Sequence, residues 1–298
     1  MFSKLVSYIV FPVHLTLQMI SLAFWALCIT LLGLIKFTLP FSFITKFLNV
    51  ILNTMMCAFG FCSVALIKFM NKVELDYVVE GELSKKEWYL VVANHLSWLD
   101  IILLTDFAAG KIPAPKFFLK KELIWLPFVG LGAWALDMPF MQRYSKAFLQ
   151  KNPHLEGKDI TTTKKSCEKF RPLPTTVINF VEGNRFTPEK QKLKKSPFEN
   201  LLPPKAGGIA FTLATMGELF TSVLDITIMY PDTQGSPMMA MLGGRLKKVI
   251  IRINVHPVTD EIIGDYFNDE KFKQGFQSWL NTVWQNKDKL ITHLKGTS

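Results

Sequence analysis

Apolar and polar positions divide the chain into two regions of different character. Two long uncharged stretches, Leu5 to Ile35 and Phe47 to Ile67, precede the first acidic residue, Glu74, and lysines flank both. Each exceeds the ~20 apolar residues that span a bilayer as a helix. Four polar side chains interrupt them: His14, Gln18, Asn49 and Asn53. The pattern predicts a packed membrane-associated helical pair over residues 1–72, which crosses the membrane twice or enters one leaflet.

Residues 73–298 alternate short apolar runs with helical patterns, which is typical of an α/β domain. We predict a mixed sheet flanked by helices. The predicted strands are Val73–Val79, Tyr89–Ala93, Thr176–Val181, Val223–Met229 and Val249–Val255. The predicted helices are Trp98–Ala108, Asp159–Phe170, Gly207–Met216 and Glu270–Ile291. The lysine-rich segment Pro188–Pro197 is expected to be the least ordered.

The chain of 298 residues has a formal net charge of +10. Basic surface of this kind suits nucleic acid, but it suits anionic lipid head groups equally well. Three cysteines, Cys28, Cys57 and Cys62, lie in the apolar stretches, and Cys167 is isolated. Their spacing predicts neither disulfides nor a structural metal site, which is consistent with a domain on the cytosolic side of a membrane.

Candidate chemistry begins where the predicted strand Tyr89–Ala93 ends. His95 follows in the loop, and Ser97 with Asp100 forms a capping-box pattern that predicts a helix start near Trp98. On one continuous helix, side chains five apart would point ~140° away from each other. With His95 in the loop instead, Asp100 can fold back and fix one imidazole nitrogen, which leaves the other as a base. Alternatively, Asp100 only caps its helix and His95 only satisfies loop backbone groups.

The stretch N-H-L-S-W-L-D resembles the N-H-x-S-x-x-D form of the H-x4-D motif of glycerolipid acyltransferases. Those enzymes acylate glycerol-3-phosphate, lysophosphatidic acid and related lysophospholipids. The resemblance implies that His95 acts as general base on a glycerol hydroxyl and that Asp100 orients it. It also implies acyl-CoA or acyl-carrier protein as co-substrate, with no metal and no other cofactor.

A second block, K-K-E-L-I-W-L-P-F-V-G, is similar to the family's K-x-x-L-x-x-x-P-x-x-G, which is followed by a hydrophobic-x-x-R. The resemblance places Lys120 and Lys121 near the substrates and implies that Arg143 holds the phosphate of the acyl acceptor. Spacing alone would suggest an ordinary apolar packing segment. The formal dinucleotide fingerprint at Gly130–Ala135 is rejected, because nearby prolines leave no strand–turn–helix context.

A third block, F-V-E-G-N-R, is similar to F-x-E-G-T-R, with Asn184 in place of the usual Thr. By composition alone it would be a Gly-Asn turn with solvated charges. The resemblance instead places Glu182, Gly183 and Arg185 at the substrate. The planar fork of Arg185 suits a phosphate, and Glu182 is expected to hold Arg185 or a glycerol hydroxyl.

A fourth block, L-L-P-P-K-A-G-G-I-A, is similar to V-x-P-x-x-x-G and adds Pro204, Lys205 and Gly207 to the expected substrate-binding residues. Backbone N–H groups near Gly207 would suit an oxyanion, although the glycines alone would also fit a flexible helix start. All four blocks occur in the family's order.

Together these features predict acyl transfer to 1-acyl-sn-glycerol-3-phosphate by a bacterial inner-membrane enzyme with its catalytic domain, 73–298, on the cytoplasmic side. The alternatives are an acyltransferase that remodels other lysophospholipids, such as lysophosphatidylglycerol, a basic nucleic-acid-binding membrane protein, and a structural membrane protein. Membrane phospholipids and the acyl donor are the expected partners, and nucleic acid is not.

Overall fold

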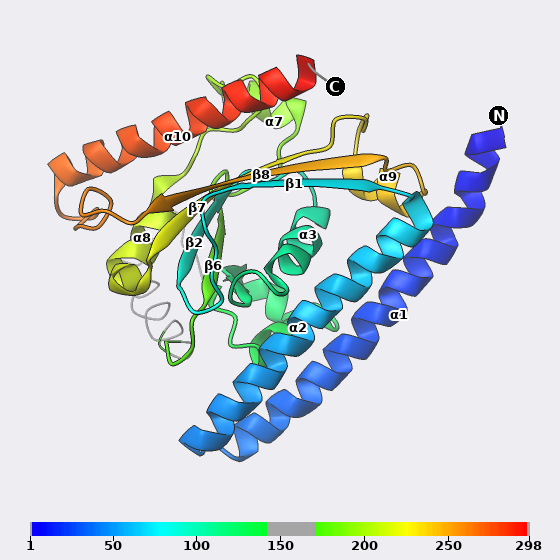
Figure 1. The fold of residues 1–298 in the computed structure, drawn as a ribbon, viewed down its shortest axis with the longest axis horizontal. Coiled ribbons are helices and arrows are strands. Elements are labelled where there is room, and N and C mark those ends of the chain that lie inside the picture. The colour runs from blue at the N-terminus through cyan, green and yellow to red at the C-terminus, as the bar shows by residue number, and fades with distance from the viewer. Residues whose placement is uncertain (1, 142–167, 169–170, 297–298) are drawn as a thin grey trace, which may run out of the picture.

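A computed structural model of the chain describes residues 2–141, 168 and 171–296. It begins with two long antiparallel helices, α1 (Phe2–Thr38) and α2 (Ser42–Asn71), which pack together as a hairpin (Figure 1). Both are long and apolar enough to cross a membrane. The helical pair predicted over residues 1–72 is therefore present.

The rest of the molecule is built on a six-stranded mixed sheet, as predicted. Its order is β1-β8-β7-β2-β6-β3, and only the β7–β8 pair is antiparallel. The strands are β1 (Glu74–Glu80), β2 (Tyr89–Ala93), β3 (Pro115–Phe117), β6 (Thr176–Phe180), β7 (Ser222–Met229) and β8 (Lys248–Pro257). A separate two-stranded ladder joins β4 (Leu119–Lys120) to β5 (Phe140–Met141).

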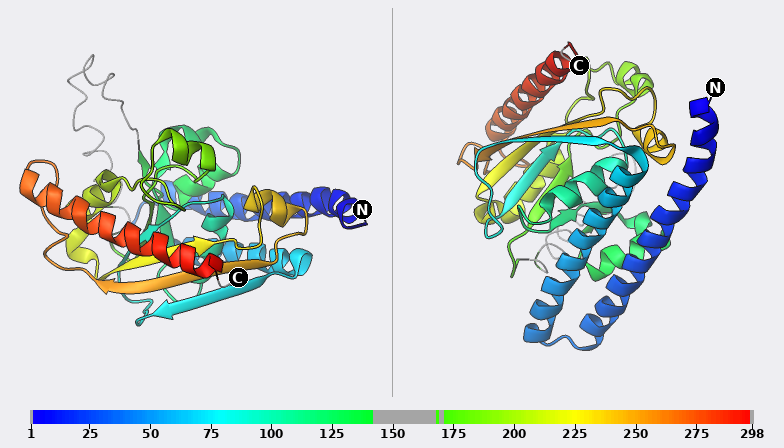
Figure 2. Two further views of the ribbon diagram at one scale, coloured as in Figure 1. Left: turned by 90° about the horizontal axis from the view of Figure 1, so that it is seen from above. Right: turned by 45° about the vertical axis from the view of Figure 1, so that its right-hand side comes forward.

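Successive residues of the central strand β2 supply two hydrophobic cores, because side chains alternate between the faces of a sheet. Val91 and Ala93 pack with the hairpin, with α3 (Leu99–Ala108) and with α4 (Val129–Ala135). Leu90 and Val92 pack with α8 (Ala206–Met216) and the C-terminal helix α10 (Glu270–Gly296). Figures 1 and 2 show α10 and the hairpin on opposite sides of the sheet.

Short elements complete the described fold: η1 (Lys121–Trp125), α7 (Pro188–Leu193), η4 (Gly217–Leu219) and α9 (Pro237–Leu242). The expectation that Pro188–Pro197 is the least ordered segment is wrong, since six of its ten residues form α7. Thr187 caps this helix by accepting a hydrogen bond from the Lys190 amide, and Pro188 occupies its first turn, where no N–H is needed. The predicted helix Asp159–Phe170 lies outside the described residues except at 168, and Cys167 lies outside them as well.

The polar side chains that interrupt the hairpin find partners inside the molecule. In α1, a ring nitrogen of His14 lies 3.0 Å from the Met241 carbonyl, and Gln18 donates to the Ser63 carbonyl of α2. In α2, Asn49 and Asn53 each accept a hydrogen bond from a lysine, Lys36 and Lys116 respectively, at 3.0 Å.

These contacts extend along the whole hairpin. Ser7 donates to the Gly243 carbonyl near the start of α1, and Lys36 forms an ion pair with Asp137 at 2.8 Å near its end. One face of the hairpin is therefore fixed to the α/β region. Many apolar side chains of α1 and α2 remain exposed, among them Phe24, Leu27, Leu31, Phe43, Phe47, Phe61 and Phe69.

Candidate active site

The site begins at the carboxyl end of β2, where the loop 94–98 turns into α3. The side chain of Asp100, in the first turn of α3, folds back to this loop and is completely buried. Its Oδ2 lies 2.8 Å from His95 Nδ1 and accepts hydrogen bonds from the amides of Leu96 and Ser97 at 2.7 and 2.9 Å. Because a carboxylate only accepts, the proton of the neutral ring is placed on Nδ1, and Nε2 keeps its lone pair.

Tyr230, directly after β7, completes the surroundings of Asp100. Its buried hydroxyl donates to Asp100 Oδ1 at 2.5 Å. Burial, assisted by the neighbouring Asp100 charge, raises the pKa of Tyr230 well above its usual value, so the hydroxyl stays protonated. The sequence reasoning missed this residue. Its position at the end of a predicted strand was the available signal, because parallel neighbouring strands end at the same sheet edge.

Asn94 fixes the start of the same loop to the neighbouring strand. Its carboxamide donates to the Ile228 carbonyl at 2.9 Å and accepts from the Ile228 amide at 2.8 Å. The side chain thus replaces a pair of backbone hydrogen bonds where β2 ends. His95 is held at the edge of the sheet rather than on a freely moving loop.

Glu182 lies behind His95 and has no exposed surface. Its two oxygens accept hydrogen bonds from the amides of His95 (3.3 Å) and Leu202 (3.1 Å). Burial raises the pKa of Glu182 to about 7, an effect that these amides and the Lys287 charge oppose. Of the two partners expected for Glu182, Arg185 is not bonded to it, because the two amides hold the carboxylate inside, and a glycerol hydroxyl stays a prediction.

Arg185 lies on the surface, with its guanidinium over an aromatic ring instead. Its guanidinium carbon is 4.7 Å from the centre of the Trp98 ring. The following residue, Phe186, donates its amide to the His95 carbonyl at 2.8 Å. The third sequence block is therefore attached directly to the first.

A cavity of about 580 Å³ opens beside His95. Its apolar wall includes Phe117 and Phe180, and Phe180 stacks on the His95 ring with 4.0 Å between ring centroids. The structure brings the predicted residues His95, Lys120, Gly183 and Lys205 together in its lining. Gly183 has a φ of +64° and packs against the Lys205 side chain, which accounts for a glycine there.

The other predicted substrate-binding residues are placed differently. Lys121 begins η1, Pro204 is half-buried, and Gly207 lies in the exposed first turn of α8; none of the three lines the cavity. Arg143 lies outside the described residues, and its role stays a prediction.

A second, almost entirely apolar groove of about 400 Å³ adjoins this cavity, and the sequence reasoning did not foresee it. Phe117 and Leu119 line both spaces. The groove runs between α1, α3, η1 and α4, and its wall includes Trp25, Ile101 and Leu126. The cavity beside His95 and the apolar groove are therefore neighbours that share these two side chains.

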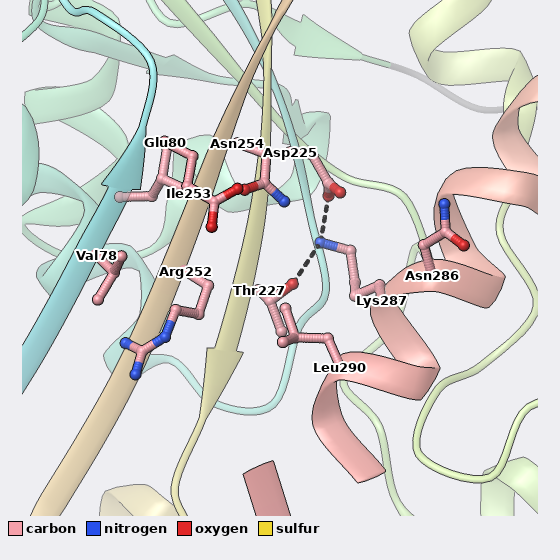
Figure 3. A pocket seen from close by; sticks show the side chains of 10 residues that line it. All are labelled: Val78, Glu80, Asp225, Thr227, Arg252, Ile253, Asn254, Asn286, Lys287 and Leu290. Atoms are coloured by element: carbon pink, nitrogen blue, oxygen red, sulfur yellow. Dashed lines mark hydrogen bonds and ion pairs between the residues drawn. The ribbon is translucent and has the colours of Figure 1, made fainter. Parts of the chain in front are cut away.

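Beneath α10, on the other face of the sheet, a third cavity surrounds a buried ion pair (Figure 3). Lys287 Nζ lies 2.5 Å from Asp225 Oδ1 and donates to the Ile226 carbonyl and the Thr227 hydroxyl. Burial lowers the pKa of Lys287, which the neighbouring Asp225 and Glu182 charges oppose. The pair ties the C-terminal helix to β7 at Asp225, three residues before Ile228, which is bonded to Asn94.

Among the described residues, no cluster of three or more His, Cys, Asp or Glu side chains is arranged to hold a metal ion. The chemistry that the described site offers is a histidine with one fixed ring nitrogen and one available ring nitrogen. It lies between a basic cavity and an apolar groove.

Comparison with known proteins adds independent information. A family model described as Acyltransferase matches residues 76–230. The 1-acyl-sn-glycerol-3-phosphate acyltransferase 3 of Arabidopsis thaliana is 27% identical over 207 residues, 63% of this chain and 52% of that protein. The 2-acyl-1-lysophosphatidylinositol acyltransferase of Saccharomyces cerevisiae is 24% identical over 248 residues, 70% of this chain and 62% of that protein.

The chain spans about half the length of the first curated relatives that it matches. A solved structure covers far more of it. The crystal structure of the 1-acyl-sn-glycerophosphate acyltransferase PlsC from Thermotoga maritima matches 97% of both chains, with a TM-score of 0.53 and 18% sequence identity. At this identity the likeness concerns the fold.

Proposed function

The chain belongs to the Acyltransferase family, and on that basis we propose that it acylates the free hydroxyl of a lysophospholipid, preferentially 1-acyl-sn-glycerol-3-phosphate. The acyl donor in this proposal is a thioester, acyl-CoA or acyl-carrier protein. One observation carries the proposal: His95 is bonded to the buried carboxylate of Asp100 at 2.8 Å, in the lining of a basic cavity that adjoins an apolar groove.

In the proposed reaction, His95 Nε2 takes the proton of the acceptor hydroxyl as its oxygen attacks the thioester carbonyl. The tetrahedral intermediate then collapses, the C–S bond breaks, and protonated His95 returns the proton to the leaving thiolate. Asp100 stabilises the imidazolium. A positioned base of this kind contributes ~10²–10⁴-fold. Stabilisation of the oxyanion by the first amides of α8 stays a prediction from the sequence, since Gly207 itself does not line the cavity.

The acceptor phosphate is proposed to bind the basic side of the site. Lys120 and Lys205 line the cavity, and Arg185 lies on the loop that is bonded to His95. Arginine suits this role because its planar fork can donate two parallel hydrogen bonds to phosphate oxygens. Arg143 is proposed as a further phosphate ligand from the family resemblance.

The apolar groove is proposed to hold a fatty acyl chain. A chain with its carbonyl near His95 would pass Phe117 and Leu119 into the groove, because these two side chains line both spaces. Burying methylene groups there is favourable by about 0.8 kcal/mol each.

Membrane association is proposed to occur through one leaflet. Contacts with the α/β region run from Ser7 to Lys36 along α1, so the hairpin cannot cross a bilayer without taking polar surface with it. The exposed apolar face of the hairpin would enter the leaflet, together with Trp125 of η1, which is 87% exposed. The sequence-based expectation of a bacterial inner membrane, with the α/β domain on its cytoplasmic side, stays part of this proposal.

The test is an acyl-transfer assay with purified protein, both donors and a panel of acceptors: 1-acyl-sn-glycerol-3-phosphate, lysophosphatidylglycerol and lysophosphatidylinositol. His95→Ala should reduce the rate by at least ~10², whereas His256→Ala, at an exposed histidine near the end of β8, should leave it unchanged. Preference for another acceptor would assign a remodelling function. Substantial turnover by folded His95→Ala would refute the general-base role.

A further inference from the structure

Trp98 occupies a position between three parts of the site. It lies in the His95 loop, immediately before α3, and 47% of its surface is exposed. Its ring faces the Arg185 guanidinium at 4.7 Å, and it also contributes to the wall of the apolar groove. The contact with Arg185 is separate from the packing of Trp98 in the groove wall.

A contact between the guanidinium and the face of the Trp98 ring leaves the N–H groups of the arginine available. The five N–H groups of a guanidinium lie in its plane, so a ring that covers the plane's face competes with none of them. The ring quadrupole attracts a cation within about 6 Å. Trp98 can therefore fix the direction of the Arg185 fork while every donor remains able to reach an anion.

The main chain restrains the same arginine from its other end. Phe186 donates its amide to the His95 carbonyl at 2.8 Å, and Lys190 Nζ donates to the Arg185 carbonyl at 3.1 Å. The Arg185 backbone and its guanidinium are thus both attached to the short segment that carries His95. Ordering a flexible side chain before its ligand arrives removes part of the entropic cost of binding.

We propose that Trp98 is a positioning residue for the acyl acceptor. By holding the Arg185 fork, it sets where the phosphate monoester of a lysolipid lies relative to the His95 base. Because the same indole lines the groove, the phosphate site and the groove share one wall. This inference rests on the proposed function, in which Arg185 binds the acceptor phosphate.

A double-mutant cycle in steady-state kinetics tests the proposal. Trp98→Leu keeps an apolar wall but removes the ring, and should raise the acceptor KM about two- to fivefold. The donor KM and kcat should change little. Trp98→Phe, which keeps a ring face, should recover most of the loss. In an Arg185→Ala background, Trp98→Leu should cause no further change in the acceptor KM.

The outcomes separate this inference from the proposed function. An unchanged acceptor KM in Arg185→Ala would remove the phosphate assignment itself. If Arg185→Ala raises the acceptor KM but Trp98→Leu acts equally in both backgrounds or not at all, the positioning role fails and the proposed function stands. Trp98→Met replaces the leucine variant if that does not fold. Phe267→Leu, at an aromatic residue just before α10 that is 49% exposed, should leave the acceptor KM unchanged.

Discussion

Replacing Glu182 by glutamine keeps the shape of the buried side chain and removes its charge. In the wild type, the two carboxylate oxygens accept the amides of His95 and Leu202. Glutamine offers one carbonyl oxygen, so one of these amides would face an NH2 group. An unsatisfied buried donor costs about 1–3 kcal/mol. This loss should be the same at every pH.

The loss of charge acts in the opposite direction and depends on pH. Burial raises the pKa of Glu182 from 4.5 to about 7, so the folded wild type binds this proton more tightly than the unfolded chain. Its contribution to stability is therefore fully present below pH 4.5 and declines as the pH rises towards 7. At 1.36 kcal/mol per pH unit, the total is about 3 kcal/mol. Glutamine does not titrate and loses nothing over this range.

The assay is unfolding in detergent micelles at pH 5 and pH 8 for the wild type, Glu182→Gln and the exposed control Glu261→Gln. Glu182→Gln should be less stable than the wild type at pH 5 by about 1–3 kcal/mol. Between pH 5 and pH 8 the wild type should lose most of about 3 kcal/mol of stability, which Glu182→Gln keeps. The stability difference between the two should therefore change by that amount, whereas the control should show no such change. A stability difference that is equal at both pH values would refute the reasoning.

Three further predictions concern packing and the membrane. Lys287→Met should cost about 3–5 kcal/mol by leaving Asp225 without its cation, and adding Asp225→Leu should restore much of the melting temperature. Gly33→Ala should lower the melting temperature, because an added Cβ would lie 2.3 Å from the nearest carbon of α4. A nitroxide at position 125 should be buried from water in anionic vesicles, whereas one at position 193, which is equally apolar and exposed, should stay accessible. Equal accessibility would exclude Trp125 from the membrane contact.

The strands that form the centre of the sheet could be predicted because their sequences are buried on both faces. The predicted run Tyr89–Ala93 coincides with β2, and Val223–Met229 differs from β7 by one residue. The strands β3, β4 and β5 were missed because runs of two or three residues show no periodicity. The helix α7 was missed because its lysines suggested a solvated loop, although the Thr187 cap and Pro188 were local signals of a helix start.

The contacts of the site that join residues close in sequence could be predicted. The spacing of His95 and Asp100 indicated that a loop and a first helical turn could bring them together, and the structure places them 2.8 Å apart. Tyr230 contacts the same carboxylate from 130 residues away, and only the order of strands in the sheet brings it there. The inward direction of Glu182 likewise depends on Leu202, in a loop that no local pattern connects with it.

The pairing of β1 with β8 has a consequence for biosynthesis. In the described sheet, β1 is an edge strand whose neighbour is β8, over 160 residues later in translation. His14 and Asn71 likewise have their partners, Met241 and Leu246, far along the chain. Contacts of such high contact order form slowly, and the ribosome delivers these partners long after the hairpin. The hairpin therefore reaches its native contacts in two stages: Asn53 and Lys36 can bind Lys116 and Asp137 early, whereas its far end is completed only when Met241 and Leu246 have been made.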